Sequence, residues 1–205
     1  MLTIYIARHG QNVDNADGLL NGHRDLPLTT IGVQQAAEAA AKLKTLGIVF
    51  DAIYTSPLVR ASHTAKIIAE VTNSSKPIVL ASLIERDFGD LTGVAQSRIK
   101  ELCEPDIICA DKMVYFLAPP NGETFPQLLK RAQTVLADVR AAHHEGAVLL
   151  VCHMDIGNMI YAAYYNLAWR AVLDNFYFGN SEVLKLSPDS APEAARIFSI
   201  QQFNT

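Results

Sequence analysis

Short apolar runs rich in β-branched residues alternate along this chain with longer segments whose apolar residues recur at helical spacing. The expected strands are 2–8, 50–55, 76–83, 147–152, 182–186 and 196–203. The expected helices are 34–46, 58–71, 123–143 and 155–165. Strands that alternate with helices favour a mostly parallel sheet covered by helices on both faces, so the pattern predicts an α/β fold.

Capping residues support some of these boundaries. Thr29 and Thr30 precede the helix at 34–46 and offer a polar N-cap, while Gly47 suits its C-terminal end. Ser56-Pro57 is typical punctuation for a helix start and stands directly before 58–71.

The chain has 205 residues, the length of one large domain, and it shows no internal repeat and no long Pro/Gly linker. We therefore expect a single domain over 1–205. The stretch 93–122 belongs to the least regular part of the sequence, and long irregular segments often cover a site. It is the best candidate for a cap or lid.

Composition restricts the partners and the compartment. A net charge of −4 argues against a general binder of nucleic acid or anionic membranes. No apolar stretch approaches the ~20 residues that cross a bilayer, and the N-terminus lacks the basic and apolar regions of a signal peptide. Three cysteines without a dense framework fit a reducing compartment. We expect a cytoplasmic protein, with Tyr161, Tyr164 and Tyr165 either in the core or at the contact of a possible homodimer.

Polar residues stand at the ends of the expected strands. Arg8-His9-Gly10 ends the first strand and His153 ends the strand at 147–152. Arg60 lies just inside the helix after the second strand, and Glu85 follows the third strand. The carboxyl ends of parallel strands share one edge of a sheet, where α/β proteins bind ligands. These side chains are therefore expected to converge on one pocket, with Gly10 allowing a sharp turn beside the ligand.

The residue types suit phosphoryl transfer. A neutral imidazole such as that of His9 can attack phosphorus, and the resulting phosphohistidine hydrolyses readily. Two arginines and a second histidine would stabilise the charge on the transferring group. A carboxylic acid, here Glu85, would protonate the leaving alcohol and later accept a proton from water. This chemistry requires neither a metal nor another cofactor.

Several ordered motifs carry a resemblance to a known family. They are Arg8-His9-Gly10, Asn15, 21–29 (NGHRDLPLT), 56–61 (SPLVRA), 83–89 (LIERDFG) and 151–153 (VCH), with weaker matches at 122–124 and 180–181. In this order they resemble the histidine phosphatase (phosphoglycerate mutase-like) superfamily, which implies a three-layer α/β/α sandwich.

The resemblance also implies residue roles. His9 would be the nucleophile and Glu85 the proton donor, while Arg8, Arg60 and His153 would form the phosphate pocket. Substrate contacts would come from Asn15, Asn21 and Gly22. His23 lies in the same motif and would either contact the substrate or serve as a cap.

The chain departs from the family pattern at instructive positions. Met154 stands where the family usually has glycine after its second histidine, and could narrow the pocket. The mutases carry a basic pair ahead of a proline cluster, for which Lys112-Met113 before Pro119-Pro120 is the nearest equivalent. With one basic residue instead of two, the favoured activity is a phosphomonoesterase acting on a small phosphorylated metabolite. The alternatives are a bisphosphoglycerate-dependent phosphoglycerate mutase and a catalytically weak phospho-ligand sensor.

A metal or thiol site has little support in the sequence. Cys103 and Cys109 are two potential ligands without a matching pair, so a zinc site is not expected. Cys152 precedes His153 in a strand, where adjacent side chains point to opposite faces, and it is expected in the core.

Overall fold

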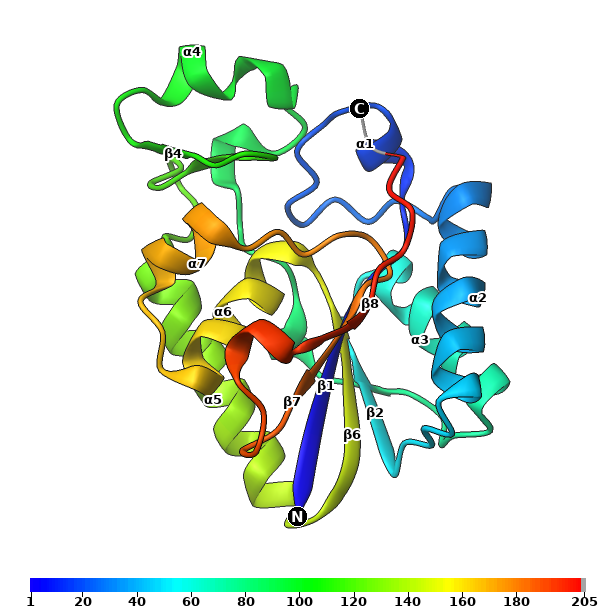
Figure 1. Ribbon diagram of the computed structural model, residues 1–205. Coiled ribbons are helices and arrows are strands. Elements are labelled where there is room, and N and C mark those ends of the chain that lie inside the picture. Colours follow the sequence, from blue (N-terminus) through cyan, green and yellow to red (C-terminus); the bar gives the residue numbers. More distant parts are fainter. Residues whose placement is uncertain (204–205) are drawn as a thin grey trace.

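The computed structural model describes residues 1–203, and within them the main sheet has six strands (Figure 1). The strand order is β3 (Ile78–Val79), β2 (Ala52–Thr55), β6 (Gly146–Cys152), β1 (Leu2–Arg8), β7 (Val183–Leu186) and β8 (Arg196–Phe198). The first four strands pair in parallel, whereas β7 is antiparallel to β1 and β8 is antiparallel to β7. The predicted mostly parallel sheet is confirmed.

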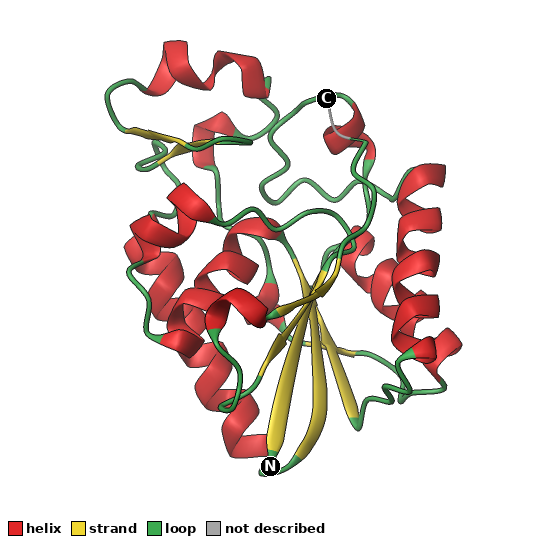
Figure 2. Cartoon of the chain, viewed as in Figure 1, coloured by secondary structure: helices red, strands yellow, loops and turns green. Residues whose placement is uncertain are grey.

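Helices cover both faces of the sheet, as Figure 2 shows. One face carries α5 (Phe125–Ala142), α6 (Met154–Tyr165) and α7 (Trp169–Asn175), and the other carries α2 (Thr30–Thr45) and α3 (Val59–Thr72). The three-layer α/β/α sandwich is therefore confirmed.

The central strand β6 shows why both faces need a cover. Val148 and Leu150 belong to the core cluster on the α5 and α6 side, while Leu149 and Val151 belong to the cluster on the α2 and α3 side. All four side chains are fully buried. A strand buried on both faces reads as a continuous apolar run because its alternate residues enter two cores. Cys152 lies fully buried in the first of these clusters, as predicted.

Some boundaries differ from the sequence-based expectation. Helix α2 begins at Thr30, not at 34, because the Thr29 side chain caps it by accepting the N–H of Gly32. The third strand is only Ile78–Val79, since only these two residues pair with β2, and a 3₁₀ turn at Ala81–Leu83 follows. The last strand ends at Phe198 instead of 203.

The stretch 93–122 contains structure that was not predicted. It holds a 3₁₀ turn (Gln96–Arg98), helix α4 (Ile99–Cys103) and an antiparallel hairpin of β4 (Ile107–Cys109) and β5 (Val114–Phe116). Ile99 and Phe116 of this stretch share a separate small core with Leu20, Phe88 and Leu91. In Figure 1 this segment stands above the carboxyl edge of the sheet.

Two further short helices were not predicted either, α1 (Val13–Ala16) after the first strand and α7 before β7. Across residues 1–203, none of the helices combines the length and apolar character that spanning a bilayer needs.

Candidate functional site

A small cavity of about 50 Å³ lies at the carboxyl edge of the sheet. Its lining includes six residues that the sequence analysis selected, namely Arg8, His9, Asn15, Asn21, Arg60 and Glu85. His153 adjoins it, since its ring centroid is 5.0 Å from that of His9 in an edge-on arrangement. The predicted convergence of these strand-end side chains therefore occurs.

His9 follows β1 and is almost fully buried. Its Nδ1 lies 2.6 Å from the carbonyl oxygen of Gly10, which can only accept, so Nδ1 carries the proton. Nε2 is then left with its lone pair, toward which Arg60 Nε donates at 3.3 Å. Burial, then the charges of Arg60 and Arg8, hold the pKa of His9 well below its usual 6.5. The imidazole is therefore neutral near pH 7 and presents an unprotonated Nε2.

We expected Gly10 to allow a sharp turn, but Gly10 is not one of the described glycines with a positive φ. The absence of a side chain at Gly10 instead permits close packing. A Cβ at Gly10 would lie 2.2 Å from the carbonyl oxygen of Gly32, and one at Gly32 would lie 1.9 Å from that of Gln11. The two glycines thus let the first turn of α2 pack directly on the backbone beside His9.

His153 directly follows β6 and forms the N-cap position of α6. Its Nε2 is 2.7 Å from the hydroxyl of Ser56, at the turn before α3, while its Nδ1 is buried without a hydrogen-bond partner. Burial and the charge of Arg60 hold the pKa of His153 well below 6.5. If the Ser56 hydroxyl donates to Nε2, Nδ1 carries the proton and can donate it to an anion in the site.

Two buried arginines supply positive charge. Arg60, at the start of α3, is fully buried, and burial lowers its pKa to about 10, which still leaves it charged at neutral pH. Its Nη2 donates to the carbonyl oxygen of Gly22 at 3.0 Å. Arg8 Nη1 donates to the carbonyl oxygen of Phe178 at 2.7 Å and contacts Met154 Sδ at 3.5 Å, while its Nε is buried without a partner.

The carboxyl group of Glu85 is buried against the start of α6. Oε1 accepts the backbone N–H of Arg86 at 2.9 Å and of Ile156 at 3.2 Å, and Oε2 accepts that of Asp155 at 3.4 Å. Burial and the nearby charge of Asp155 raise the pKa of Glu85, against the lowering effect of the backbone donors and Arg60. A carboxyl group with a raised pKa is suited to giving up a proton in catalysis.

The other predicted contact residues divide into two sets. Asn15 and Asn21 line the cavity, and Asn15 Oδ1 accepts from Asn180 Nδ2 at 3.2 Å. Gly22 and His23 are absent from the lining, and the exposed His23 instead donates from Nε2 to the carbonyl oxygen of Glu85 at 2.8 Å. Their contact with substrate stays a prediction.

Several residues at the site were not selected from the sequence. Asn180 also donates to the carbonyl oxygen of His9 at 3.0 Å, so it ties the nucleophile loop to Asn15. Arg86 and Asp155 form a buried ion pair at 2.8 Å behind Glu85. The weak match at 180–181 was the available signal for Asn180, and the motif at 83–89 contains Arg86.

A larger hollow of about 620 Å³ lies elsewhere, among α7, the β4–β5 turn and η4 (Pro192–Ala194). It shares only Met113 and Tyr115 with the lining of the small cavity. Lys112 belongs to this hollow, with its ammonium 5.6 Å from the Tyr177 ring centroid. Size therefore does not identify the reactive site, because the buried histidines, arginines and glutamic acid gather at the small cavity. Within residues 1–203, no group of three His, Cys, Asp or Glu side chains is arranged to hold a metal ion.

A comparison with protein families bears on this arrangement. The model of the histidine phosphatase superfamily (branch 1) matches residues 4–196, a span that contains every residue named above as lining the small cavity. The chain belongs to the histidine phosphatase superfamily.

Relatives of this superfamily member carry mutase names. A 2,3-bisphosphoglycerate-dependent phosphoglycerate mutase from Rhizobium etli is 32% identical over 203 residues, which cover 97% of this chain and 92% of the relative. The mutase of the same name from Bradyrhizobium diazoefficiens is 38% identical over 131 residues, which cover 63% of each chain.

Solved structures similar to this one carry phosphatase names. A mycobacterial glucosyl-3-phosphoglycerate phosphatase in complex with VO3 is 25% identical with a TM-score of 0.76, and the match covers 98% of both chains. Phosphoserine phosphatase from Entamoeba histolytica, at 22% identity, has a TM-score of 0.73 over 100% of this chain and 98% of its own. The latter likeness shows the fold.

Proposed function

We propose that this member of the histidine phosphatase superfamily is a phosphomonoesterase that hydrolyses a small phosphorylated metabolite through phospho-His9. The observation that carries the proposal is the presence of a neutral His9 and a buried carboxyl group of raised pKa, Glu85, in the lining of one small cavity. Arg8 and Arg60 line the same cavity and His153 lies beside His9, so all three can serve as donors for phosphoryl oxygens.

The first half-reaction follows from this geometry. His9 Nε2 attacks phosphorus, and the bond from phosphorus to the ester oxygen breaks, with its electron pair going to that oxygen. Glu85 gives its proton to the leaving oxygen, so that an alcohol departs. The arginine N–H groups and His153 stabilise the charge on the three equatorial oxygens. In this scheme Arg60 Nε, which faces the His9 lone pair in the free protein, turns its N–H to a phosphoryl oxygen.

The second half-reaction returns the enzyme to its starting state. Glu85, now ionised, accepts a proton from water, whose oxygen attacks the phosphoryl group on His9. The bond between phosphorus and Nε2 breaks, and inorganic phosphate leaves. The nitrogen recovers its lone pair while Nδ1 keeps its proton on the Gly10 carbonyl.

Met154 supports hydrolysis over transfer to a second phosphorylated substrate. Its side chain lines the cavity and its sulfur contacts Arg8, so it occupies space where a glycine would leave room. Lys112, the nearest equivalent of the basic pair of the mutases, lies in the larger hollow and not at the cavity lining. The cavity thus has positive charge for one phosphoryl group and little room for a second anionic group.

A bisphosphoglycerate-dependent mutase is the second candidate, favoured by the names of the curated relatives. In that reaction phospho-His9 would pass its group to a second substrate instead of water.

Residues of 93–122, among them Gln96, Met113 and Val114, line the cavity, and we propose this segment as the lid that excludes or admits water. Protection of 93–122 from limited proteolysis by saturating vanadate is expected, and unchanged cleavage would refute the lid.

A panel of substrates separates the two activities. Sugar phosphates, phosphoglycerates, nucleotides and an aryl phosphate are offered separately, with phosphate release and phosphoglycerate isomerisation measured in parallel. Hydrolysis of at least one phosphomonoester, faster than any isomerisation and absent in His9→Ala, is expected. Isomerisation that exceeds phosphate release would establish the mutase, and binding of vanadate without any turnover would indicate a sensor.

A further inference from the structure

The loop that carries Glu85 has little regular structure of its own. Residues 85–88 lie outside any helix or strand, between the 3₁₀ turns Ala81–Leu83 and Gly89–Leu91. Buried backbone carbonyl groups in such a loop need partners from elsewhere in the chain. What supplies those partners also decides where Glu85 stands.

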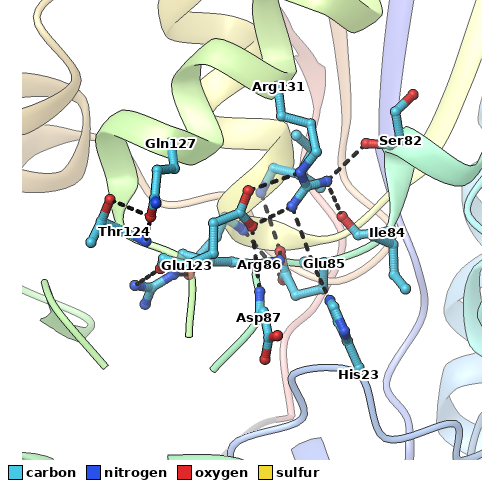
Figure 3. Close-up of polar contacts among 12 residues, drawn as sticks. His23, Ser82, Ile84, Glu85, Arg86, Asp87, Glu123, Thr124, Gln127 and Arg131 are labelled. Carbon is cyan, nitrogen blue, oxygen red and sulfur yellow. Dashed lines mark hydrogen bonds and ion pairs between the residues drawn. The ribbon is translucent and has the colours of Figure 1, made fainter. Parts of the chain in front are cut away.

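A single guanidinium group on α5 binds the carbonyl of Glu85 and two carbonyls in the residues just before it. Arg131 Nη1 donates to the carbonyl oxygens of Ser82 at 2.8 Å and Ile84 at 2.6 Å, and its Nη2 donates to that of Glu85 at 3.2 Å. Figure 3 shows the guanidinium reaching these carbonyls from the helix. One side chain thus gathers three carbonyl groups that no ladder of a sheet holds.

Glu123 fixes the orientation of that guanidinium. Its Oε1 accepts from Arg131 Nε at 3.0 Å and its Oε2 accepts from Nη2 at 2.6 Å, as Figure 3 shows. With three carbonyls and one bidentate carboxylate, the five N–H donors of an arginine are all used. The backbone N–H of Glu123 donates to the carbonyl oxygen of Asp87 at 2.8 Å, so the pair holds the loop on both sides of Glu85. We call Arg131 and Glu123 the clamp.

Glu85 is held at its two ends by different parts of the protein. Its carbonyl oxygen accepts from Arg131 and from His23, whereas its carboxyl group accepts backbone N–H groups at the start of α6. Neither Arg131 nor Glu123 lines the cavity. They can act on the reaction only through residues that do line it, and Glu85 is the lining residue whose backbone Arg131 holds directly.

We propose that Arg131, oriented by Glu123, is a positioning residue that sets where the carboxyl group of Glu85 meets the leaving oxygen. This inference rests on the proposed function. Proton transfer demands placement within a fraction of an ångström, so a looser loop should slow it. Phosphate binding should be spared, because Arg8 lies in β1, Arg60 in α3 and His153 directly after β6.

The test compares two leaving groups in Arg131→Lys, which keeps the charge but cannot form the planar fork. The control is Arg140→Lys on the same helix, whose guanidinium lies over the Tyr164 ring at 5.3 Å. Turnover of an alkyl phosphate should fall by roughly 10- to 100-fold in Arg131→Lys, the scale of a misplaced catalytic group. The burst with an activated aryl phosphate, which needs little acid assistance, should change by less than about threefold.

Inhibition by vanadate should also stay within about twofold of the wild type, because the phosphate pocket is untouched. Equal losses for both leaving groups would show that Arg131 only supports the fold, and no loss for either would show that it does nothing for Glu85. Either result overturns the proposal.

Amide hydrogen exchange provides a second readout that needs no turnover. Because it is measured in two clamp variants, it does not depend on the correct folding of either one alone. Amide hydrogen exchange over 82–88 should quicken in Arg131→Lys and in Glu123→Gln, and stay unchanged in β1, β6 and Arg140→Lys. Unchanged exchange over 82–88 in both clamp variants would overturn the positioning role. A wild type that hydrolyses no phosphoester would instead refute the proposed function and leave exchange to decide on the clamp.

Discussion

The two sides of the cavity are built by different means. On the phosphate side, β1 pairs with β6 in unbroken register from Leu2 opposite Gly146 to Arg8 opposite Cys152, and the N–H of His9 extends the ladder to the carbonyl oxygen of Cys152 at 3.0 Å. On the acid side, Glu85 lies in a loop held by the Arg131 side chain. Binding and attack should therefore be robust to changes in the loop, whereas protonation of the leaving group should be sensitive to them.

Glu85→Gln breaks the acid side alone and has the largest expected effect. Turnover of an alkyl phosphate should fall by roughly 10²–10⁴, the usual contribution of a positioned acid or base. Formation of phospho-His9 from an activated aryl phosphate should suffer much less, because a phenolate leaves without a proton. The comparison uses the burst phase, since hydrolysis of the phosphoenzyme also needs Glu85. Equal losses for both leaving groups would assign the proton to another donor, with His153 the first to examine.

Acid pH should weaken the phosphate side through its two buried histidines. The folded pKa values of His9 and His153 lie well below the 6.5 of the unfolded chain, so the unfolded state binds protons more readily below that pH. Above pH 6.5 the two histidines do not reduce the free energy of unfolding. As the pH falls below 6.5, this free energy should decrease by about 1.4 kcal/mol per pH unit for each histidine.

Urea unfolding at a series of pH values below neutrality measures this slope. His153→Asn removes one titrating group and should make it shallower. Glu85 acts in the opposite sense, because its raised pKa stabilises the fold at low pH and that contribution is lost as the pH rises through the folded value. A slope that is the same in His153→Asn as in the wild type would contradict the burial of a neutral imidazole at this position.

Met154→Gly tests the point where the two sides meet, because this residue contacts Arg8 and lines the cavity. Removing the side chain should raise kcat/KM for a phosphoglycerate relative to a small phosphomonoester by roughly tenfold, the scale of a few methylene-sized contacts. Steady-state kinetics on both substrates give the ratio of the two kcat/KM values. Met113→Ala, which shortens a cavity-lining side chain in the segment 93–122, serves as the comparison. An unchanged ratio in Met154→Gly would remove this residue from the account of specificity.

Chelation should have no effect on activity. Arg8 and Arg60 already carry the positive charge that a divalent ion supplies in other phosphoryl-transfer sites. Activity is measured after exhaustive treatment with a chelator and again after adding Mg²⁺ or Zn²⁺. Loss that a metal restores would mean that the charge of the phosphate side is insufficient.

The same contrast explains what could be predicted from the sequence. The long strands and helices around His9, Arg60 and His153 have clear periodicity, and parallel strands bring their ends to one edge, so their convergence could be predicted. The hairpin β4–β5 has strands of three residues, too short for a periodic pattern. The third strand was predicted too long because its β-branched residues meet a partner strand at only two positions.

The clamp could not be predicted for another reason. Arg131 and the carbonyl oxygen of Glu85 are 46 residues apart, and a hydrogen bond from a side chain to a distant backbone carbonyl has no local sequence signature. The weak match at 122–124 contained Glu123, but only the structure shows which guanidinium it orients.

The central claim is that phosphate is carried on His9, and rapid quench tests it most directly. Wild-type protein is mixed with a radiolabelled aryl phosphate and stopped within the first turnover. We expect acid-labile, alkali-stable label on the peptide that contains His9, and none in a His9→Ala variant that remains folded by circular dichroism. Label on another residue, or a burst of undiminished size in His9→Ala, would contradict the account.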